Sequence, residues 1–184
     1  MIKILIYFII IVANLNYAIS NLDSLDYLIY SIVIEEMDKY PNNDTLIIDE
    51  FASDSIVGIK LEWDWHRMKF QSNLKNAFIS VNRDYDILNR CFSLHKPYKI
   101  LKKKEYLLFK DTTIFDAWWD NFYKVYPHTY GIINLSKIGY NKNKTNALLI
   151  YSISHHYVCE GFMFLLENRK GKWRIKRWEV AFQC

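Results

Sequence analysis

The residue types best suited to chemistry gather in one short segment, at His155, His156, Cys159 and Glu160. A cysteine thiolate is a strong nucleophile, and an adjacent imidazole can lower the pKa of the thiol or accept its proton. In a catalytic interpretation, Cys159 attacks, His155 or His156 is its base, and Ser136 or Asp120 lies nearby. In the alternative interpretation the segment is a polar loop with a structural or disulfide-bonded cysteine, which the absence of a nucleophile-elbow pattern favours.

The same segment could instead contribute to a metal site. His155 or His156 would bind the metal together with Glu160, and His95 or His128 would add a further ligand. The two adjacent histidines do not have the i, i+4 spacing of a zinc-binding helix. We therefore expect no metal site.

Carboxylates offer a third chemistry, because glycoside hydrolysis needs a pair of them. Glu62 or Asp64 could form such a pair with Asp84 or Asp86, beside Trp63 and Trp65. An alternation of tryptophan and acid is equally typical of a strand with one wet face. The sequence contains no Gly-rich phosphate loop, no GxSxG and no HExxH, so we expect no cofactor.

The N-terminus has the pattern of a secretory signal peptide. Lys3 supplies the positive charge, residues 4–13 form an apolar run too short to span a bilayer, and Ala18 and Ser20 are small residues near a cleavage site. We predict a signal peptide over residues 1–20 and a single domain over residues 21–184. The mature chain is expected to be secreted or periplasmic, soluble and without a membrane span.

The net charge of +4 is distributed unevenly: residues 21–60 hold nine acids and two bases, whereas residues 61–184 hold eleven acids and 21 bases. A basic face attracts polyanions or an anionic membrane surface, and the alternative is a solvated face balanced by the acidic N-terminal part. A polyanion or a protein is a possible partner of the basic residues. Nucleic acid is not expected as a partner of a secreted protein. The densest basic stretch is a predicted hairpin with Arg169, Lys170, Lys172, Arg174, Lys176 and Arg177.

The three cysteines, Cys91, Cys159 and Cys184, allow at most one intramolecular disulfide. An oxidising compartment favours such a bond. Cys159 could pair with either of the other two, and the sequence leaves the choice open.

Helical spacing of apolar residues predicts helices over residues 24–40 and 74–81. Ser24 is expected to cap the first helix, and Pro41 to end it. Short strands are predicted over residues 45–49, 61–65 and 106–109, and residues 85–94 fit either a helix or a strand.

The block from 113 to 182 has the strongest pattern. Thr113 and Asp116 are expected to cap a helix that Pro127 ends, and its aromatic stripe should pack on a sheet. Strands follow over residues 132–138, 147–154 and 161–167, and a turn over residues 168–171 with Gly171 at a positive φ leads to a last strand. There the apolar phase changes between Ile175 and Trp178, Val180 and Phe182, which predicts a β-bulge near residues 176–177.

Helices followed by a run of antiparallel strands indicate an α+β fold. We expect the helices to pack on one face of a curved antiparallel sheet, with a C-terminal β-meander.

The C-terminal third also resembles a family of uncharacterised secreted or periplasmic bacterial proteins. The resemblance covers a Trp-containing helix and then Tyr126-Pro127, Leu135-Ser136, Ile138-Gly139-Tyr140-Asn141, Ala147-Leu148-Leu149, Cys159, Gly161, Leu165-Leu166-Glu167 and Gly171-Lys172-Trp173. It implies an extracytoplasmic location and no assigned activity. Family members have a Cys-Gly-rich segment where this sequence has residues 155–160, so the resemblance implies no role for the histidines. The closing hairpin is also similar to the end of cystatin-like and NTF2-like folds.

Together these patterns predict a small secreted or periplasmic domain that binds a partner or associates with the envelope and does not catalyse a reaction. The alternative is a secreted hydrolase that uses Cys159 with His155 or His156.

Overall fold

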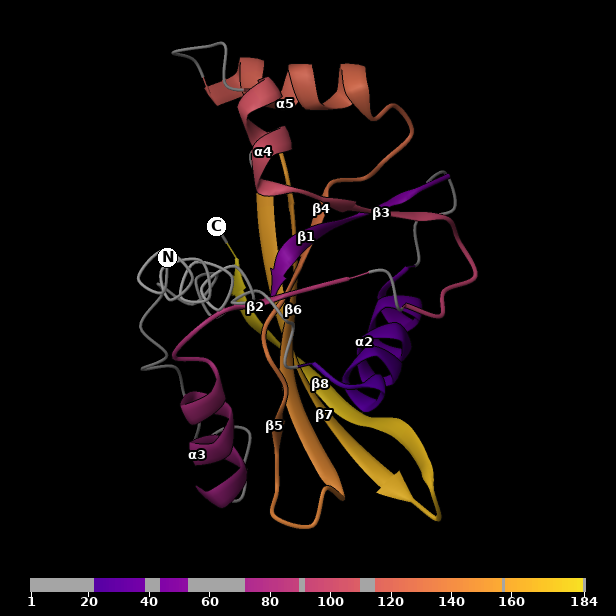
Figure 1. Ribbon diagram of the computed structural model, residues 1–184, viewed down its shortest axis with the longest axis vertical. Helices are drawn as coiled ribbons and strands as arrows, with labels where there is room; N and C mark the ends of the chain where they lie inside the picture. The colour runs from indigo at the N-terminus through magenta and orange to yellow at the C-terminus, as the bar shows by residue number, and fades with distance from the viewer. Residues whose placement is uncertain are drawn as a thin grey trace, which may run out of the picture.

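The computed structural model describes residues 22–38, 44–52, 72–89, 92–109, 115–156 and 158–183. A curled mixed sheet runs through the molecule in the order β2-β1-β4-β6-β7-β8, with β3 beside β1 and β5 beside β6 (Figure 1). The strands are β1 (Leu46–Ala52), β2 (Asp86–Ile87), β3 (Tyr98–Leu101), β4 (Ile132–Leu135), β5 (Gly139–Tyr140), β6 (Asn146–His155), β7 (Val158–Arg169) and β8 (Lys172–Gln183). The helices are α2 (Ser24–Met37), α3 (Ser72–Val81), α4 (Lys103–Tyr106) and α5 (Phe115–Val125), and a 3-10 turn covers Leu107–Phe109.

Helix α2 covers one face of the sheet. Its buried side chains Tyr27, Tyr30 and Ile34 pack against alternate residues of the strands, such as Leu149 of β6 and Phe164 of β7. The predicted N-cap of this helix is wrong by one residue, because the N-cap is Asp23 and not Ser24. The Asp23 carboxylate accepts hydrogen bonds from the backbone N–H groups of Leu25 and Asp26. The Asp26 carboxylate in turn accepts one from the backbone N–H of Asp23, which completes a capping box.

Helices α3 and α5 cover the opposite face, which corrects the expectation that all helices share one face. Leu74 and Phe78 of α3 pack on Leu148 and Ile150 of β6, the residues that alternate with those facing α2. The aromatic stripe of α5 packs on a sheet as predicted, through Trp119 and Phe122 on Ile47, Leu101, Phe109 and Ile132. Figure 1 shows α2 and α3 on opposite sides of the sheet.

The expectation of a purely antiparallel sheet is wrong, because β1 pairs in parallel with both β3 and β4. The cause is a long connection: β4 reaches β1 only after α3, β2, β3, α4 and α5, and parallel neighbours need such crossovers. The C-terminal part is a meander as predicted, since β6, β7 and β8 pair antiparallel in sequence order. The fold is therefore α+β with a mixed sheet.

The β7–β8 hairpin contains the predicted turn and the predicted bulge. Lys170 and Gly171 have φ of 54° and 82°, as a tight two-residue hairpin turn requires. Leu165 pairs with Arg177 and Leu166 with Ile175, which leaves Lys176 as the extra residue of a bulge.

The strand contains a second bulge that was not predicted. Because of it, the face of the sheet predicted for Phe182 is wrong. Gly161 pairs with Phe182 and Phe162 with Val180, so Ala181 is extra. Phe182 therefore lies on the face opposite Val180, although the sequence predicted one shared face. Its ring occupies the space over Gly161, where a Cβ would lie 2.2 Å from the ring.

The strand predicted over residues 106–109 is wrong, because this segment is the helical turn α4 followed by the 3-10 turn. A strand would place Tyr106 and Phe109 on opposite faces. The helical spacing brings both toward Trp118, whose ring lies 5.9 Å from that of Tyr106 and 5.2 Å from that of Phe109. Leu107 and Leu108 remain exposed.

Several predictions fall on parts that the structure does not describe: the signal peptide, the strand over residues 61–65, Thr113, and the side chain of Asp116. The predicted strand over residues 132–138 is shorter, because β4 ends at Leu135 and β5 begins at Gly139. Among the described helices, none has the length and apolar character needed to cross a membrane.

Replacing Gly139 by alanine tests the packing of α3 against β5. A Cβ there would lie 2.4 Å from the Phe78 Cα, so helix and strand would have to separate. We expect Gly139→Ala to lower the free energy of unfolding by about 1–3 kcal/mol or more, measured by urea denaturation. Gly171→Asn is the control, because position 171 has open space around it and asparagine tolerates a positive φ. Equal stability of the Gly139→Ala protein and the unmodified protein would contradict this packing.

Candidate functional site

The residues singled out for chemistry lie where β6 turns into β7, but they do not converge. Ser154 is paired with Cys159, and His155 with Val158, so His155 and Cys159 point to opposite faces of the sheet. Glu160 is paired with Ile153, whose side chain packs on the α2 side. His155 and Glu160 therefore share the α2 side, while Cys159 packs beside the α3 cluster. This register separates the His155 imidazole from the Cys159 sulfur.

Cys159 is disulfide-bonded. The chain has two other cysteines, Cys91 and Cys184, and both lie outside the described residues. A sulfur held in a disulfide is not a thiolate and cannot act as the attacking nucleophile.

The two histidines are held by aromatic neighbours. The ring of His155 lies 4.4 Å from that of Tyr130. His156 has a φ of 38°, and its ring stacks on Tyr123 at 4.9 Å and on Trp119 at 6.2 Å. Tyr123 in turn donates a hydrogen bond to the Tyr130 carbonyl. These contacts fasten the β6–β7 turn to helix α5, which is a structural role.

Ser136 and Asp120, the other members of the predicted catalytic set, are also placed apart. Ser136 is fully buried; its hydroxyl donates to the Lys137 carbonyl at 3.0 Å and accepts from the Ile150 N–H at 2.8 Å. The serine thereby fills the gap between β4 and β5 along β6. Asp120 is an exposed residue of α5.

The proposed metal ligands do not gather either. His95 lies 2.7 Å from a carboxylate oxygen of Glu35 at the end of α2, and His128 has a φ of 62° in the loop before β4. No group of three or more histidine, cysteine, aspartate or glutamate side chains within the described ranges could hold a metal ion. For the carboxylate pair, Asp86 lies 3.7 Å from the Lys137 ammonium and Asp84 is exposed, while residues 62 and 64 lie outside the described ranges.

A polar network that the sequence did not indicate joins α4 to the sheet. Lys99 contacts Glu105 at 2.7 Å and donates to the Tyr126 hydroxyl at 2.6 Å. Tyr106 donates to the Asp49 carboxylate at 2.5 Å. Burial raises the pKa of both Asp49 and Tyr106. Each member has a partner within the network, which is consistent with a role in docking α4.

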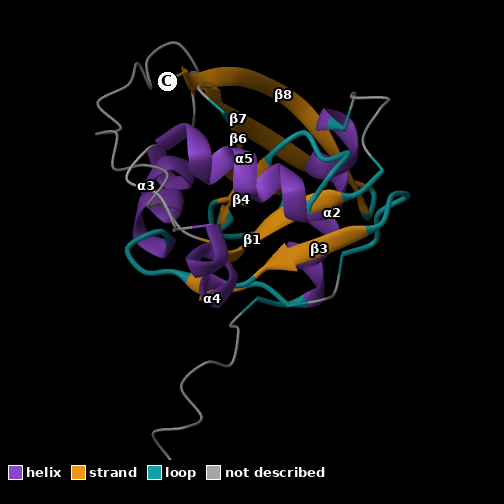
Figure 2. Ribbon diagram, turned by 90° about the horizontal axis from the view of Figure 1, so that it is seen from above, coloured by secondary structure: helices purple, strands orange, loops and turns teal. Residues whose placement is uncertain are grey.

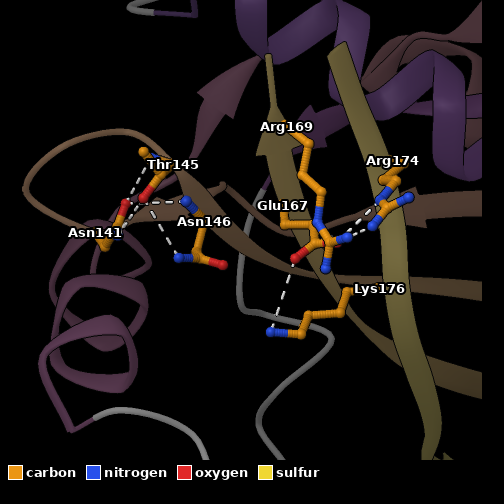
Figure 3. A network of polar contacts seen from close by, with 7 residues as sticks. All are labelled: Asn141, Thr145, Asn146, Glu167, Arg169, Arg174 and Lys176. Atoms are coloured by element: carbon orange, nitrogen blue, oxygen red, sulfur yellow. Dashed lines mark hydrogen bonds and ion pairs between the residues drawn. The ribbon is translucent and has the colours of Figure 1, made fainter. Parts of the chain in front are cut away.

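The strongest candidate for function is the basic β7–β8 hairpin, where three cations surround one carboxylate (Figure 3). Glu167 lies 2.8 Å from both Arg169 and Arg174 and 3.8 Å from Lys176. The Arg174 guanidinium, followed by that of Arg169, holds the pKa of Glu167 below its usual range. One negative charge is thus shared by three positive charges, and the net charge of the cluster is positive.

The turn between β5 and β6 lies against this hairpin. The Asn168 N–H donates to the Thr145 carbonyl at 2.8 Å, and Asn141 orders the turn by accepting hydrogen bonds from the N–H groups of Thr145 and Asn146. Together the turn and the hairpin form what we call the basic end. Its exposed lysines and arginines are Lys142, Lys144, Arg169, Lys170, Lys172, Arg174 and Lys176.

No protein-family model matches this chain, and comparison with curated proteins and with solved structures gives no significant match. The resemblance to a bacterial family therefore stays a prediction.

Disulfide mapping tests the chemistry of Cys159. Glu160 is paired with Gln183, the last residue of β8, and Cys184 follows Gln183 in the sequence. We therefore expect a peptide that joins Cys159 to Cys184 in a digest of unreduced protein, and alkylation of Cys91 without prior reduction. A bond between Cys159 and Cys91 would contradict this pairing, and a reactive Cys159 thiol in the native protein would contradict the disulfide itself.

The pH dependence of stability tests the environment of His155. Burial lowers the pKa of His155 below the usual histidine value of 6.5; Glu160 opposes this shift and His156 adds to it. Below pH 6.5 the unfolded chain binds a proton at this position that the folded chain resists, so the free energy of unfolding should fall with falling pH. We expect His155→Gln to make that fall shallower in urea denaturation at about pH 5 and about pH 7.5. Identical pH slopes in both proteins would contradict the shift.

Proposed function

We propose that this protein is a secreted or periplasmic, envelope-associated binding domain without catalysis, and that it binds a polyanionic partner at the basic end. The observation that carries the proposal is the sharing of Glu167 by Arg169, Arg174 and Lys176. A surface with this excess of positive charge attracts anions over a range of about 10 Å at moderate salt. The extracytoplasmic location rests on the predicted signal peptide.

The alternative is a solvated face balanced by the acidic N-terminal part. It is disfavoured because several of those acidic residues form ion pairs elsewhere in the molecule. Glu35 pairs with His95, Asp38 with Lys96 and Glu50 with Lys102, all away from the hairpin. Of the ion pairs seen in the described ranges, one joins an N-terminal acid to the basic end, between Asp23 and Lys144 at 3.7 Å. The charge of the hairpin is therefore available to a partner.

The hydrolase alternative has less support. It needs a free Cys159 thiolate beside an imidazole, whereas Cys159 is disulfide-bonded and faces away from His155. We do not propose it.

A charge-neutralising variant tests the binding function. Lys170 and Lys172 are exposed at the tip of the hairpin, so replacing both by glutamine should leave the fold intact. We expect the double variant to bind polyglutamate about two- to thirtyfold more weakly at low salt, since each of the two exposed charges contributes about 0.2–1 kcal/mol. Binding of the unmodified protein should also weaken as salt is added.

The matched control is Lys103→Gln with Lys104→Gln, which removes the same charge from exposed residues of α4. The control should bind polyglutamate as the unmodified protein does. Equal loss in both double variants would indicate a response to net charge alone, and salt-independent binding would exclude the proposed mode. Heparin in place of polyglutamate shows whether sulfates or carboxylates are preferred.

A further inference from the structure

Strand β8 is a long edge. It has twelve residues, stands last in the order of the sheet, and within the described part of the chain pairs with β7 alone. Figure 2 shows it along the outside of the curled sheet. The N–H and C=O groups on the outer side of an edge strand are a template for a further strand.

The pairing with β7 sorts the side chains of β8 into two rows of different chemistry. Residues paired with odd-numbered positions of β7 face the α3 side, and those paired with even-numbered positions face the α2 side. The α3 side carries the cations Lys172, Arg174 and Arg177 and one acid, Glu179, with Lys176 drawn to the same side by Glu167. The α2 side carries Trp173, Ile175, Trp178 and Val180. The bulge at Lys176 preserves this division along the strand.

Protection of the edge strand against aggregation would explain the cationic row of β8 but not its exposed apolar row. Lysines and bulges are common devices on edge strands, and β8 has both. Such devices would not leave apolar side chains exposed beside the edge, yet Trp178 is 42% exposed and Val180 48% exposed. The Trp178 ring is also held in place, with its centroid 5.7 Å from that of Phe162. The edge thus combines a cationic row with an ordered apolar row.

We propose that the outer edge of β8 binds, as an added strand, an extended segment of a partner protein in which acidic residues alternate with apolar ones. Alternate side chains of a strand point to opposite faces. The acidic ones would lie beside Lys172, Arg174 and Lys176, and the apolar ones beside Trp178 and Val180, while backbone hydrogen bonds join the two strands. This inference rests on the proposed function and specifies the partner's form.

The test is calorimetric titration of the full mature chain with a capped eight-residue peptide of alternating glutamate and valine. Two peptides of equal charge are the comparisons: one with four glutamates followed by four valines, and one with the alternating order but every backbone nitrogen methylated. We expect both to bind at least about tenfold more weakly. The methylated peptide loses several backbone hydrogen bonds of about 0.5–1.5 kcal/mol each, whereas the block peptide keeps them but places glutamates and valines on both faces of the added strand.

Variants of the apolar row add a second readout. Val180→Asn should weaken binding of the alternating peptide several-fold. Val158→Asn is the matched control: Val158 is also an exposed valine, but it is on β7, one strand away from the edge. Equal effects of the two substitutions would overturn the proposed position of the peptide.

The outcomes separate this inference from the proposed function. If the methylated peptide binds as tightly as the alternating one, strand addition is excluded, whereas polyglutamate binding that depends on Lys170 and Lys172 would stand. If no anionic peptide and no polyglutamate binds, both proposals fail. If the chain sediments as a dimer that the alternating peptide does not dissociate, a second copy occupies the edge and the inference is overturned.

Discussion

The whole architecture depends on the burial of strand β6 on both faces. Its residues from Ala147 to Ile153 are all buried, so both faces of the sheet must be covered. Helix α2 packs against one set of alternate residues, and α3 against the other. Burial of this apolar surface, which stabilises by about 25 cal/mol per Å², is the main contribution of β6 to the stability of the fold. The short strands β4 and β5 pair along one edge of β6, and β7 pairs along the other.

From β6 outward the burial decreases, and the chemistry of the surface follows. Strand β7 is still covered on both faces from Met163 to Glu167, whereas β8 alternates half-buried and exposed residues from Lys172 to Val180. Its two bulges change which side chains face which side, so the cations and the apolar residues are sorted into separate rows. The same gradient explains why Glu167, on the strand next to the edge, contacts three cations at once: Arg174 and Lys176 reach its carboxylate from β8, and Arg169 from the end of β7.

The elements with strong local patterns were predictable from sequence. The aromatic stripe of α5, the continuous apolar run of β6, and the turn at Gly171 specify their own structure, and the bulge at Lys176 is visible as a change of phase. The pairing of strands that are distant in sequence was not predictable. The parallel pairing of β1 with β3 and β4 is an example, because it depends on segments far from β1 in the chain. The relative positions of the candidate site residues also depend on pairing between strands. His155 and Cys159 are close in sequence, but strand parity separates them, while the importance of Glu167 arises only from pairing between two strands.

Hydrogen–deuterium exchange tests the central claim, that β8 is the binding edge, most directly. The amides of β8 would be followed in the free protein and with the alternating glutamate–valine peptide at saturation. The account predicts slower exchange for amides on the outer side of residues 172–183, with no change at α4. Unchanged exchange along β8, or protection confined to the β6–β7 turn around His155 and His156, would contradict it.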